Sequence, residues 1–317
     1  MNPEFIPQLD QKITELNSRP ELQLNRAFSV VRRLEEHLQG IALRPGQLEH
    51  LIDELFFYVV MLPVPIPLDE KAVFTRAVRY EEARGIGYEQ VSRLSYIHPK
   101  SGVAQPVGRM NKKDRPVFYA SKGEGANALG AVLSEMAARP GEVYNVLFSE
   151  TAPFEPPEPP PELSPNVLRV MPVGVFDYYR RGLNDPFGLH QDYRDCYEYF
   201  REKTHPAGML AMQLVDAFLT DILKRKGTEL LYSVTSLIPA EIESDTRIDG
   251  VLYPSVEFEG FPNVALKTAA AELKLKHVRA ISLRVIERYG YGIFATETIG
   301  VGAVVGGRIA WGKLALD

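Results

Sequence analysis

Proline occupies every second position from residue 63 to residue 67, within the sequence LPVPIPLD (62–69), and this stretch separates two unlike parts of the chain. Each proline lacks a backbone N–H and clashes with the turn before it, so a regular helix cannot pass through the stretch. We therefore expect an extended connector here. Apolar residues follow a helical pattern before the connector and a largely strand-like pattern after it.

Residues 1–61 predict three helices with short connections. Apolar side chains recur three or four positions apart in each of them: Ile6, Leu9, Ile13 and Leu16; Leu24, Phe28, Val31, Leu34 and Leu38; and Leu48, Leu51, Leu55 and Val59. Pro20 suits the first turn of the second helix, and Pro45-Gly46 interrupts the pattern before the third. We expect residues 1–69 to form a helical N-terminal extension with its connector. The extension would pack on the following domain or act as a partner-binding module, for example in a homo-oligomer.

Residues 70–317 predict one α+β domain with a mixed β core. Apolar runs indicate strands at 73–78, 117–121, 143–148, 167–173, 251–253, 263–266, 278–286, 293–296 and 301–311. A proline-rich, acidic segment at 153–165 predicts an exposed polyproline-like loop. Because residues 177–226 show a helical pattern, we expect the region 153–226 to combine this loop with a helical insertion. A further helix is predicted at 231–243.

The composition restricts the partners and the compartment. With 36 Lys and Arg against 41 Asp and Glu, the net charge is −5, which provides no basic field for a nucleic-acid backbone. The single cysteine, Cys196, excludes an intramolecular disulfide and is compatible with a reducing compartment. No signal peptide is expected in MNPEFIPQLDQK, and the longest apolar run, at 55–68, is too short and too rich in proline to span a bilayer. We therefore expect a cytoplasmic protein without nucleic-acid or membrane partners.

Several common types of site are missing from the sequence. Glycine pairs occur at 85–87 and 123–125, but neither completes G-x-G-x-x-G after a strand, and no P-loop motif occurs. No G-x-S-x-G motif occurs, and Cys196 lies in an aromatic-rich segment without an adjacent histidine. His190 and His205 are isolated from further ligand residues, so no metal site is expected.

Polar side chains concentrate instead in the segment from Arg93 to Glu135. A tight loop carries Gly108-Arg109-Met110-Asn111, a short strand carries Tyr119, and a helix of small residues presents Glu135. Arginines suit a pyrophosphate, an aromatic side chain can pack against nicotinamide, and a carboxylate stabilises the cationic sugar that forms when a glycosidic bond breaks. With Arg76 in the first strand, these residue types favour glycosidic chemistry at a nucleotide ribose.

Five short motifs occur in a characteristic order: RLSY at 93–96, GRMN at 108–111, PVFYAS at 116–121, DGVLYPS at 249–255 and NVAL at 263–266. With a carboxylate on the helix after the third motif, this order resembles the RES domain family over about residues 72–270. The resemblance implies a fold related to the ADP-ribosyltransferases and NAD as the substrate, cleaved to release nicotinamide with phosphate or water as the acceptor. The best-known members are toxins of bacterial toxin–antitoxin pairs, which implies a small inhibitory antitoxin-like partner.

The resemblance also implies roles for individual residues. Arg76 and Arg109 would bind the NAD phosphates, with Asn111 in the same loop as Arg109. Tyr119 would lie beside nicotinamide and Glu135 at the ribose. Ser255 would hydrogen-bond the ligand or the arriving acceptor. Further candidates for the NAD pocket are Tyr96, Tyr232 and Asn263.

Other interpretations remain open for these residues and for the chain. Arg109 could brace its own turn, Tyr119 could be a core tyrosine, Ser255 could cap a turn, and Glu135 could be a surface carboxylate, with Glu124 and Glu142 as alternative glutamates. The chain could also ADP-ribosylate a macromolecule, bind NAD or ADP-ribose without turnover, or act through its helical extension and proline-rich loop. Because the extension and the insertion depart from the compact toxins, roles as toxin, defence effector or housekeeping enzyme all stay open.

Overall fold

The computed structural model describes residues 3–82, 85–98, 106–153, 166–243, 245–255, 258 and 261–313. The α-helices are α1 (Ile6–Ser18), α2 (Pro20–Leu38), α3 (Gln47–Phe56), α4 (Gly125–Glu135), α5 (Val175–Arg180), α6 (Gln191–Lys203), α7 (Pro206–Lys224), α8 (Glu229–Thr235), α9 (Ile238–Glu243) and α10 (Thr268–Lys274). The strands are β1 (Val64–Pro67), β2 (Val73–Arg79), β3 (Val117–Lys122), β4 (Val143–Thr151), β5 (Val167–Pro172), β6 (Gly250–Pro254), β7 (Pro262–Lys267), β8 (Leu275–Gly290), β9 (Ile293–Val305) and β10 (Arg308–Lys313). Short 3-10 helices occur at Pro3–Phe5, Leu68–Glu70 and Val91–Arg93. All of the predicted proline-rich loop except Pro153 lies outside the described residues.

The chain divides into two compact units. The helical unit comprises Met1–Val64, Val107–Lys112 and Met171–Asp245, and the β unit comprises Pro65–Pro106, Lys113–Val170 and Thr246–Asp317. The predicted N-terminal extension and the predicted helical insertion therefore belong to the same unit. This division differs from the predicted one, in which the extension ended at residue 69 and the insertion was part of the second domain. Each of them has an apolar face, and the two faces cover one another.

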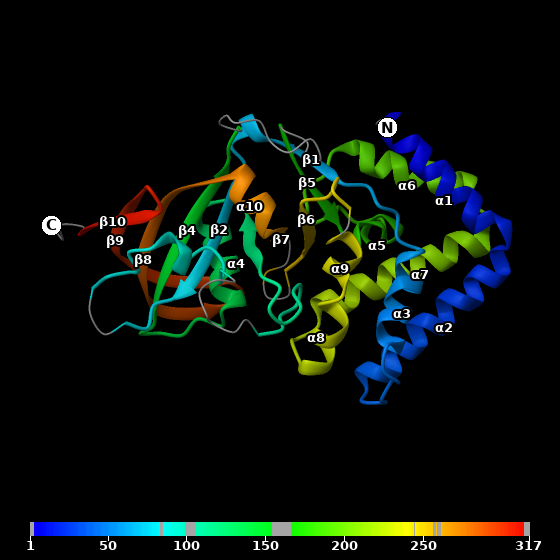
Figure 1. Ribbon diagram of the computed structural model, residues 1–317, viewed down its shortest axis with the longest axis horizontal. Helices are drawn as coiled ribbons and strands as arrows, with labels where there is room; N and C mark the ends of the chain where they lie inside the picture. Colours follow the sequence, from blue (N-terminus) through cyan, green and yellow to red (C-terminus); the bar gives the residue numbers. More distant parts are fainter. Residues whose placement is uncertain are drawn as a thin grey trace. The chain divides into compact units, whose positions relative to one another are not determined.

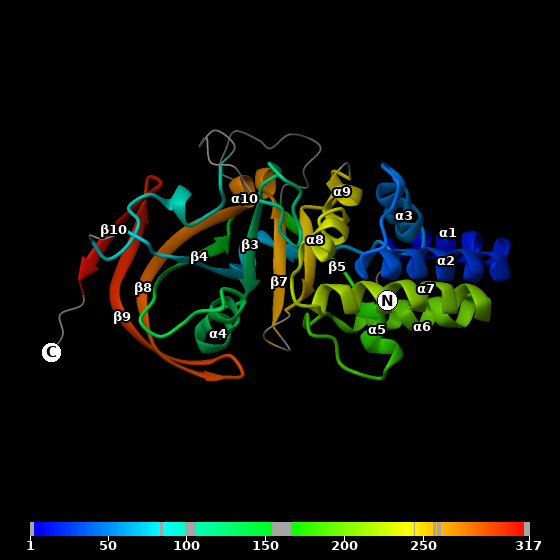
Figure 2. The same ribbon diagram turned by 90° about the horizontal axis from the view of Figure 1, so that it is seen from below.

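In the helical unit, α2 and α7 lie side by side, as both ribbon views show (Figures 1 and 2). Both helices bury aliphatic side chains, among them Leu34 of α2 and Leu219 of α7. Arg225, just after α7, binds Glu35 of α2 through two nitrogen–oxygen pairs at 2.6 and 3.0 Å. Among the described helices, α7 alone is long and apolar enough to cross a membrane, but 61% of its apolar window is buried, as in the core helix of a soluble protein.

In the β unit, ten strands form a mixed sheet in the order β1-β5-β6-β7-β3-β2-β4-β8-β9-β10. From β6 to β10, every pair of neighbours in this order is antiparallel. The predicted α+β class with a mixed β core is thus confirmed. β2 and β3 pair only through Phe74 with Lys122 and Thr75 with Ser121, so the two strands part at Arg76.

Two apolar clusters cover the sheet of the β unit. Val146 and Leu147 are adjacent in β4, so their side chains point to opposite faces. Val146 belongs to a cluster with Val132 of α4, which covers the first face. Leu147 belongs to a cluster with Leu94, in the segment after β2, on the other face. Glu135 ends α4 and therefore belongs to the first face, whereas Arg76 pairs with Leu147 and points to the other face.

Three local predictions need correction. The predicted single strand at 301–311 is wrong, because the chain turns at Gly306 and Gly307, whose φ angles are +55° and +76°, and forms the hairpin β9–β10. The predicted helix at 231–243 is interrupted, and α8 and α9 replace it. The connector contains a strand, β1, despite its prolines; β1 lies at the edge of the sheet, where a missing backbone donor is tolerated.

Candidate active site

Glu135 is the last residue of α4, and two side chains from a distant part of the sequence bind its carboxylate. Ser255 Oγ donates to Glu135 Oε1 at 2.6 Å, and Asn263 Nδ2 donates to the same oxygen at 2.8 Å. Ser255 and Asn263 are 6% and 7% exposed, whereas Glu135 is exposed to solvent. The carboxylate is therefore oriented by buried donors and is still accessible to a ligand.

Strand pairing places these donors. Asn263 in β7 pairs with Ser121 of β3 on one side and with Tyr253 of β6 on the other. Since residues opposite one another in antiparallel strands share a face, all three side chains lie on the same face of the sheet. Ser255 follows β6 directly, so the end of this strand delivers the hydroxyl to Glu135.

The Asp249-Gly250 pair of the fourth motif has a structural role at the beginning of β6. A Cβ atom at Gly250 would lie 2.4 Å from the carbonyl oxygen of Ala265, so only glycine allows β6 to approach β7 this closely. The carboxylate of Asp249 binds Lys274 Nζ at 2.7 Å and accepts the backbone N–H of Arg169 at 2.7 Å. This buried ion pair secures the beginning of the strand that ends at Ser255.

The two alternative glutamates have different surroundings. Glu124 binds Arg279 at 3.1 Å on the surface. Glu142 accepts the hydroxyl of Tyr144 at 2.7 Å and pairs with Arg79 at 3.2 Å, and the Tyr144 hydrogen bond is the main cause that lowers its pKa. Neither glutamate shows a hydrogen bond to a residue of the predicted site. Of the three, Glu135 is the best candidate for the ribose carboxylate.

Arg76 occupies the place where β2 and β3 part. Its Nη1 donates to the backbone oxygen of Tyr119 at 2.9 Å and its Nε to the backbone oxygen of Leu94 at 2.9 Å. Burial lowers the pKa of the guanidinium to about 10, while the phenols of Tyr119 and Tyr253 act in the opposite direction. Arg76 forms no ion pair with Glu135 or with any other carboxylate that the structure describes. A partly buried cation with this surrounding is suited to bind an anion.

Two further tyrosines of the β unit bear on the predicted site, Tyr253 and Tyr96. Tyr253 was not predicted as a site residue. The sequence contained one signal for it, because Tyr253 precedes Ser255 by two positions in the same motif. The hydroxyl of Tyr96 donates to the carboxylate of Glu272 in α10, and burial together with this bond raises its pKa. The ring of Tyr96 also stacks on His98. The Tyr96 hydroxyl is thus occupied by Glu272, a contact that no sequence pattern indicates.

The remaining predicted residues lie in the helical unit. Arg109 donates to the backbone oxygens of Leu223 at 3.1 Å and Arg225 at 2.9 Å, and its guanidinium lies 5.9 Å from the ring centre of Tyr232. Arg109 thereby satisfies carbonyl groups at the C-terminus of α7. Asn111 is buried, and its backbone oxygen accepts the N–H of Gly108 across the predicted tight loop. A role of Arg109, Asn111 and Tyr232 toward NAD stays a prediction.

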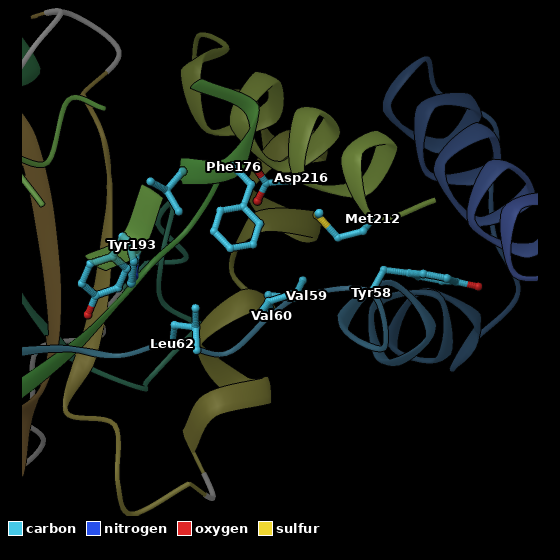
Figure 3. A pocket seen from close by; sticks show the side chains of 10 residues that line it. Tyr58, Val59, Val60, Leu62, Phe176, Tyr193, Met212 and Asp216 are labelled. Atoms are coloured by element: carbon cyan, nitrogen blue, oxygen red, sulfur yellow. The ribbon is translucent and has the colours of Figure 1, made fainter. Parts of the chain in front are cut away.

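The helical unit also encloses a small cavity around Asp216 (Figure 3). It is lined by Tyr58, Val59, Val60, Leu62, Pro172, Val175, Phe176, Tyr193, Met212 and Asp216. Its volume of about 10 Å³ admits roughly one water molecule. Asp216 accepts the backbone N–H of Asp177 at 2.5 Å, and burial raises its pKa to about 7. The cavity is too small for a substrate, so Asp216 serves the packing of α5.

Neither a metal site nor a reactive cysteine is found in the described part of the chain. No group of three or more His, Cys, Asp and Glu side chains with the geometry of a metal site occurs there. Cys196 is buried, and burial raises the pKa of its thiol to about 11, which disfavours the reactive thiolate.

Comparison with models of known protein families, with curated proteins and with solved structures finds no match to this chain.

Proposed function

We propose that the chain binds NAD in its β unit and cleaves the bond between nicotinamide and ribose, with inorganic phosphate or water as the acceptor. The observation that carries this proposal is the carboxylate of Glu135, exposed to solvent and bound by the buried donors Ser255 and Asn263. These three residues, 120 and 128 positions apart, were all predicted as site residues from the order of the motifs.

The geometry supports a role for Glu135 in stabilising the transition state. As the C–N bond breaks, nicotinamide leaves with the bonding electron pair and positive charge develops on the ribose. A fixed carboxylate can accept hydrogen bonds from the ribose hydroxyls and lower the energy of this cation. The acceptor oxygen then forms the new C–O bond, and water, where it is the acceptor, releases a proton. Ser255 and Asn263 keep the carboxylate in one orientation throughout.

Arg76 is the residue of the β unit best suited to a phosphate of NAD. Its guanidinium is positioned by two backbone carbonyl groups and carries a charge that no described carboxylate neutralises. Bidentate binding of phosphate oxygens is the usual use of such an arginine. Tyr119, whose backbone oxygen holds Arg76, is the proposed neighbour of nicotinamide.

The wider expectations from the family resemblance are part of the same proposal. We infer an ADP-ribosyltransferase-like arrangement of the β unit, a cytoplasmic location where NAD and phosphate are both present, and a small inhibitory protein as a partner. The order of the five motifs supports the arrangement and the inhibitory partner, and the contact between Glu135, Ser255 and Asn263 supports the arrangement alone. The single cysteine is compatible with a reducing compartment.

The test is incubation of the purified chain with NAD, with and without inorganic phosphate, and separation of the products by chromatography. We expect free nicotinamide, with a phosphorylated ADP-ribose when phosphate is the acceptor and ADP-ribose when water is. NAD that binds, as seen by calorimetry, but persists intact would instead indicate a binding module. Transfer of label from NAD to protein or nucleic acid would indicate a macromolecular acceptor.

A further inference from the structure

The donors to Glu135 flank the segment 255–261, which connects β6 to β7: Ser255 begins this segment, and Asn263 is the second residue of β7. Two aromatic residues of this segment, Phe258 and Phe261, meet edge to face with ring centres 5.7 Å apart and planes at 87°. The backbone N–H of Phe258 donates at 3.1 Å to Ser255 Oγ, the same hydroxyl that donates to Glu135. The position of Phe258 therefore bears directly on the orientation of Ser255.

The ring of Phe258 occupies a slot between two glycines. A Cβ atom at Gly292, in the turn between β8 and β9, would lie 2.1 Å from two atoms of this ring. A Cβ atom at Gly130 of α4 would lie 3.2 Å from the ring and 2.5 Å from the backbone oxygen of Gly292. Figure 2 shows the ends of β8 and β9 curving beside α4. The slot exists because both positions lack a side chain.

The turn that forms one wall of this slot has an unusual backbone. Gly290, Tyr291 and Gly292 have φ angles of +86°, +54° and +72°, three successive residues in the left-handed region. Tyr291 is 96% exposed, so its conformation does not serve the burial of its own ring. The conformation does bring Gly292 against Phe258.

Phe261 is anchored in a similar way at the other end of the segment. A Cβ atom at Gly123, just before α4, would lie 3.2 Å from the ring of Phe261. Gly123 has a φ angle of +120°, which favours glycine at this position. The rings of Phe258 and Phe261 thus pack against α4 and against the turn that precedes it.

We propose that Phe258 is a positioning residue of the Glu135 site. Its ring in the glycine slot fixes its backbone N–H, and this N–H fixes Ser255 Oγ in the orientation from which it donates to Glu135. The inference rests on the proposed function, because it assigns Phe258 to the same reaction. Displacing a group that orients a reacting carboxylate by about 1 Å can lower turnover by a factor on the order of 10².

The experiment compares Phe258→Leu with Phe28→Leu, the same substitution at an exposed position of α2. The first readout is the carbon-13 resonance of the Glu135 carboxyl group, assigned through its loss in Glu135→Gln. The second is kcat and KM for nicotinamide release from NAD. We expect Phe258→Leu to move the resonance in the same direction as Ser255→Ala, and to lower kcat about 10- to 100-fold with a smaller change in KM. Phe28→Leu is expected to change neither readout.

A folded Phe258→Leu protein with the wild-type resonance and the wild-type kcat would overturn the proposal. If this variant does not fold, Phe258→Met, whose unbranched side chain adapts more easily to a narrow slot, takes its place with the same expected directions. If the wild-type chain releases no nicotinamide, the proposed function fails. The carboxyl resonance then still decides whether Phe258 positions Ser255 on Glu135.

Discussion

Replacement of Lys274 with methionine is expected to lower the free energy of unfolding of the β unit by about 3–5 kcal/mol. The Lys274 and Asp249 side chains are 1% and 3% exposed, and their Nζ and Oδ2 atoms are 2.7 Å apart. Methionine fills most of the space of the lysine stem but leaves the Asp249 charge buried with the backbone N–H of Arg169 as its remaining described donor. It also removes the donor to the backbone oxygen of Val167, at 2.8 Å.

The magnitude follows from the imbalance that the substitution creates. An exposed ion pair contributes about 0–1 kcal/mol, whereas removal of one partner of a buried pair leaves an uncompensated charge. The double variant Lys274→Met with Asp249→Asn removes that charge and keeps an acceptor for Arg169. We therefore expect the double variant to recover most of the loss caused by Lys274→Met alone.

Urea-induced unfolding at pH 7, followed by tryptophan fluorescence, measures this effect in the β unit alone. The single tryptophan, Trp311, lies in β10, and its indole N–H donates to the backbone oxygen of Tyr88 at 2.9 Å. A loss below about 1 kcal/mol in Lys274→Met would refute the reasoning, because it would match an exposed pair. So would a double variant that is no more stable than Lys274→Met.

Three further predictions concern other parts of the chain. The raised pKa of Asp216, about 7 against about 3.9 when unfolded, means that the folded protein holds a proton that the unfolded chain releases between these values. Stability should therefore fall as the pH rises through this window. Asp216→Asn should lose less stability than the wild type between pH 5 and pH 8, measured as the change in the urea midpoint. An equal change in the two proteins would contradict this assignment. Gly130→Ala should lower the urea midpoint, because its Cβ would lie 2.5 Å from the backbone oxygen of Gly292. At an open helix position the same substitution would raise stability by about 1 kcal/mol, so a raised midpoint would show that the slot is open. Arg109→Gln removes two donors to carbonyl groups at the end of α7 and should cost about 1–3 kcal/mol by thermal unfolding. A capping role alone leaves KM for NAD unchanged, and a several-fold rise in KM would support the predicted phosphate role.

The elements that follow from local patterns could be predicted from the sequence. Helical periodicity identifies α1, α2 and α3, and apolar runs identify β2, β3 and β4, because burial of one face determines both patterns. The pairing of α2 with α7 could not be predicted, since two apolar stripes far apart in the sequence do not specify each other.

The candidate site was predictable to a similar degree. The order of the motifs selected Glu135, Ser255 and Asn263, which the structure brings into contact. The slot for Phe258 was not predictable, because it depends on the left-handed turn at Gly292 and on the close approach of α4. Neither feature has a local signature beyond the glycines themselves.

The most direct measurement of the central claim is the rate of nicotinamide release from NAD by the wild-type chain, Glu135→Gln and Glu124→Gln. The glutamine at position 135 keeps the size of the side chain but removes the charge that would stabilise the cationic ribose, whereas Glu124 binds Arg279 on the surface. We predict turnover by the wild type and by Glu124→Gln, and a loss on the order of 10²- to 10³-fold in Glu135→Gln. Equal rates in all three proteins, or no release by the folded wild type with or without phosphate, would contradict the account.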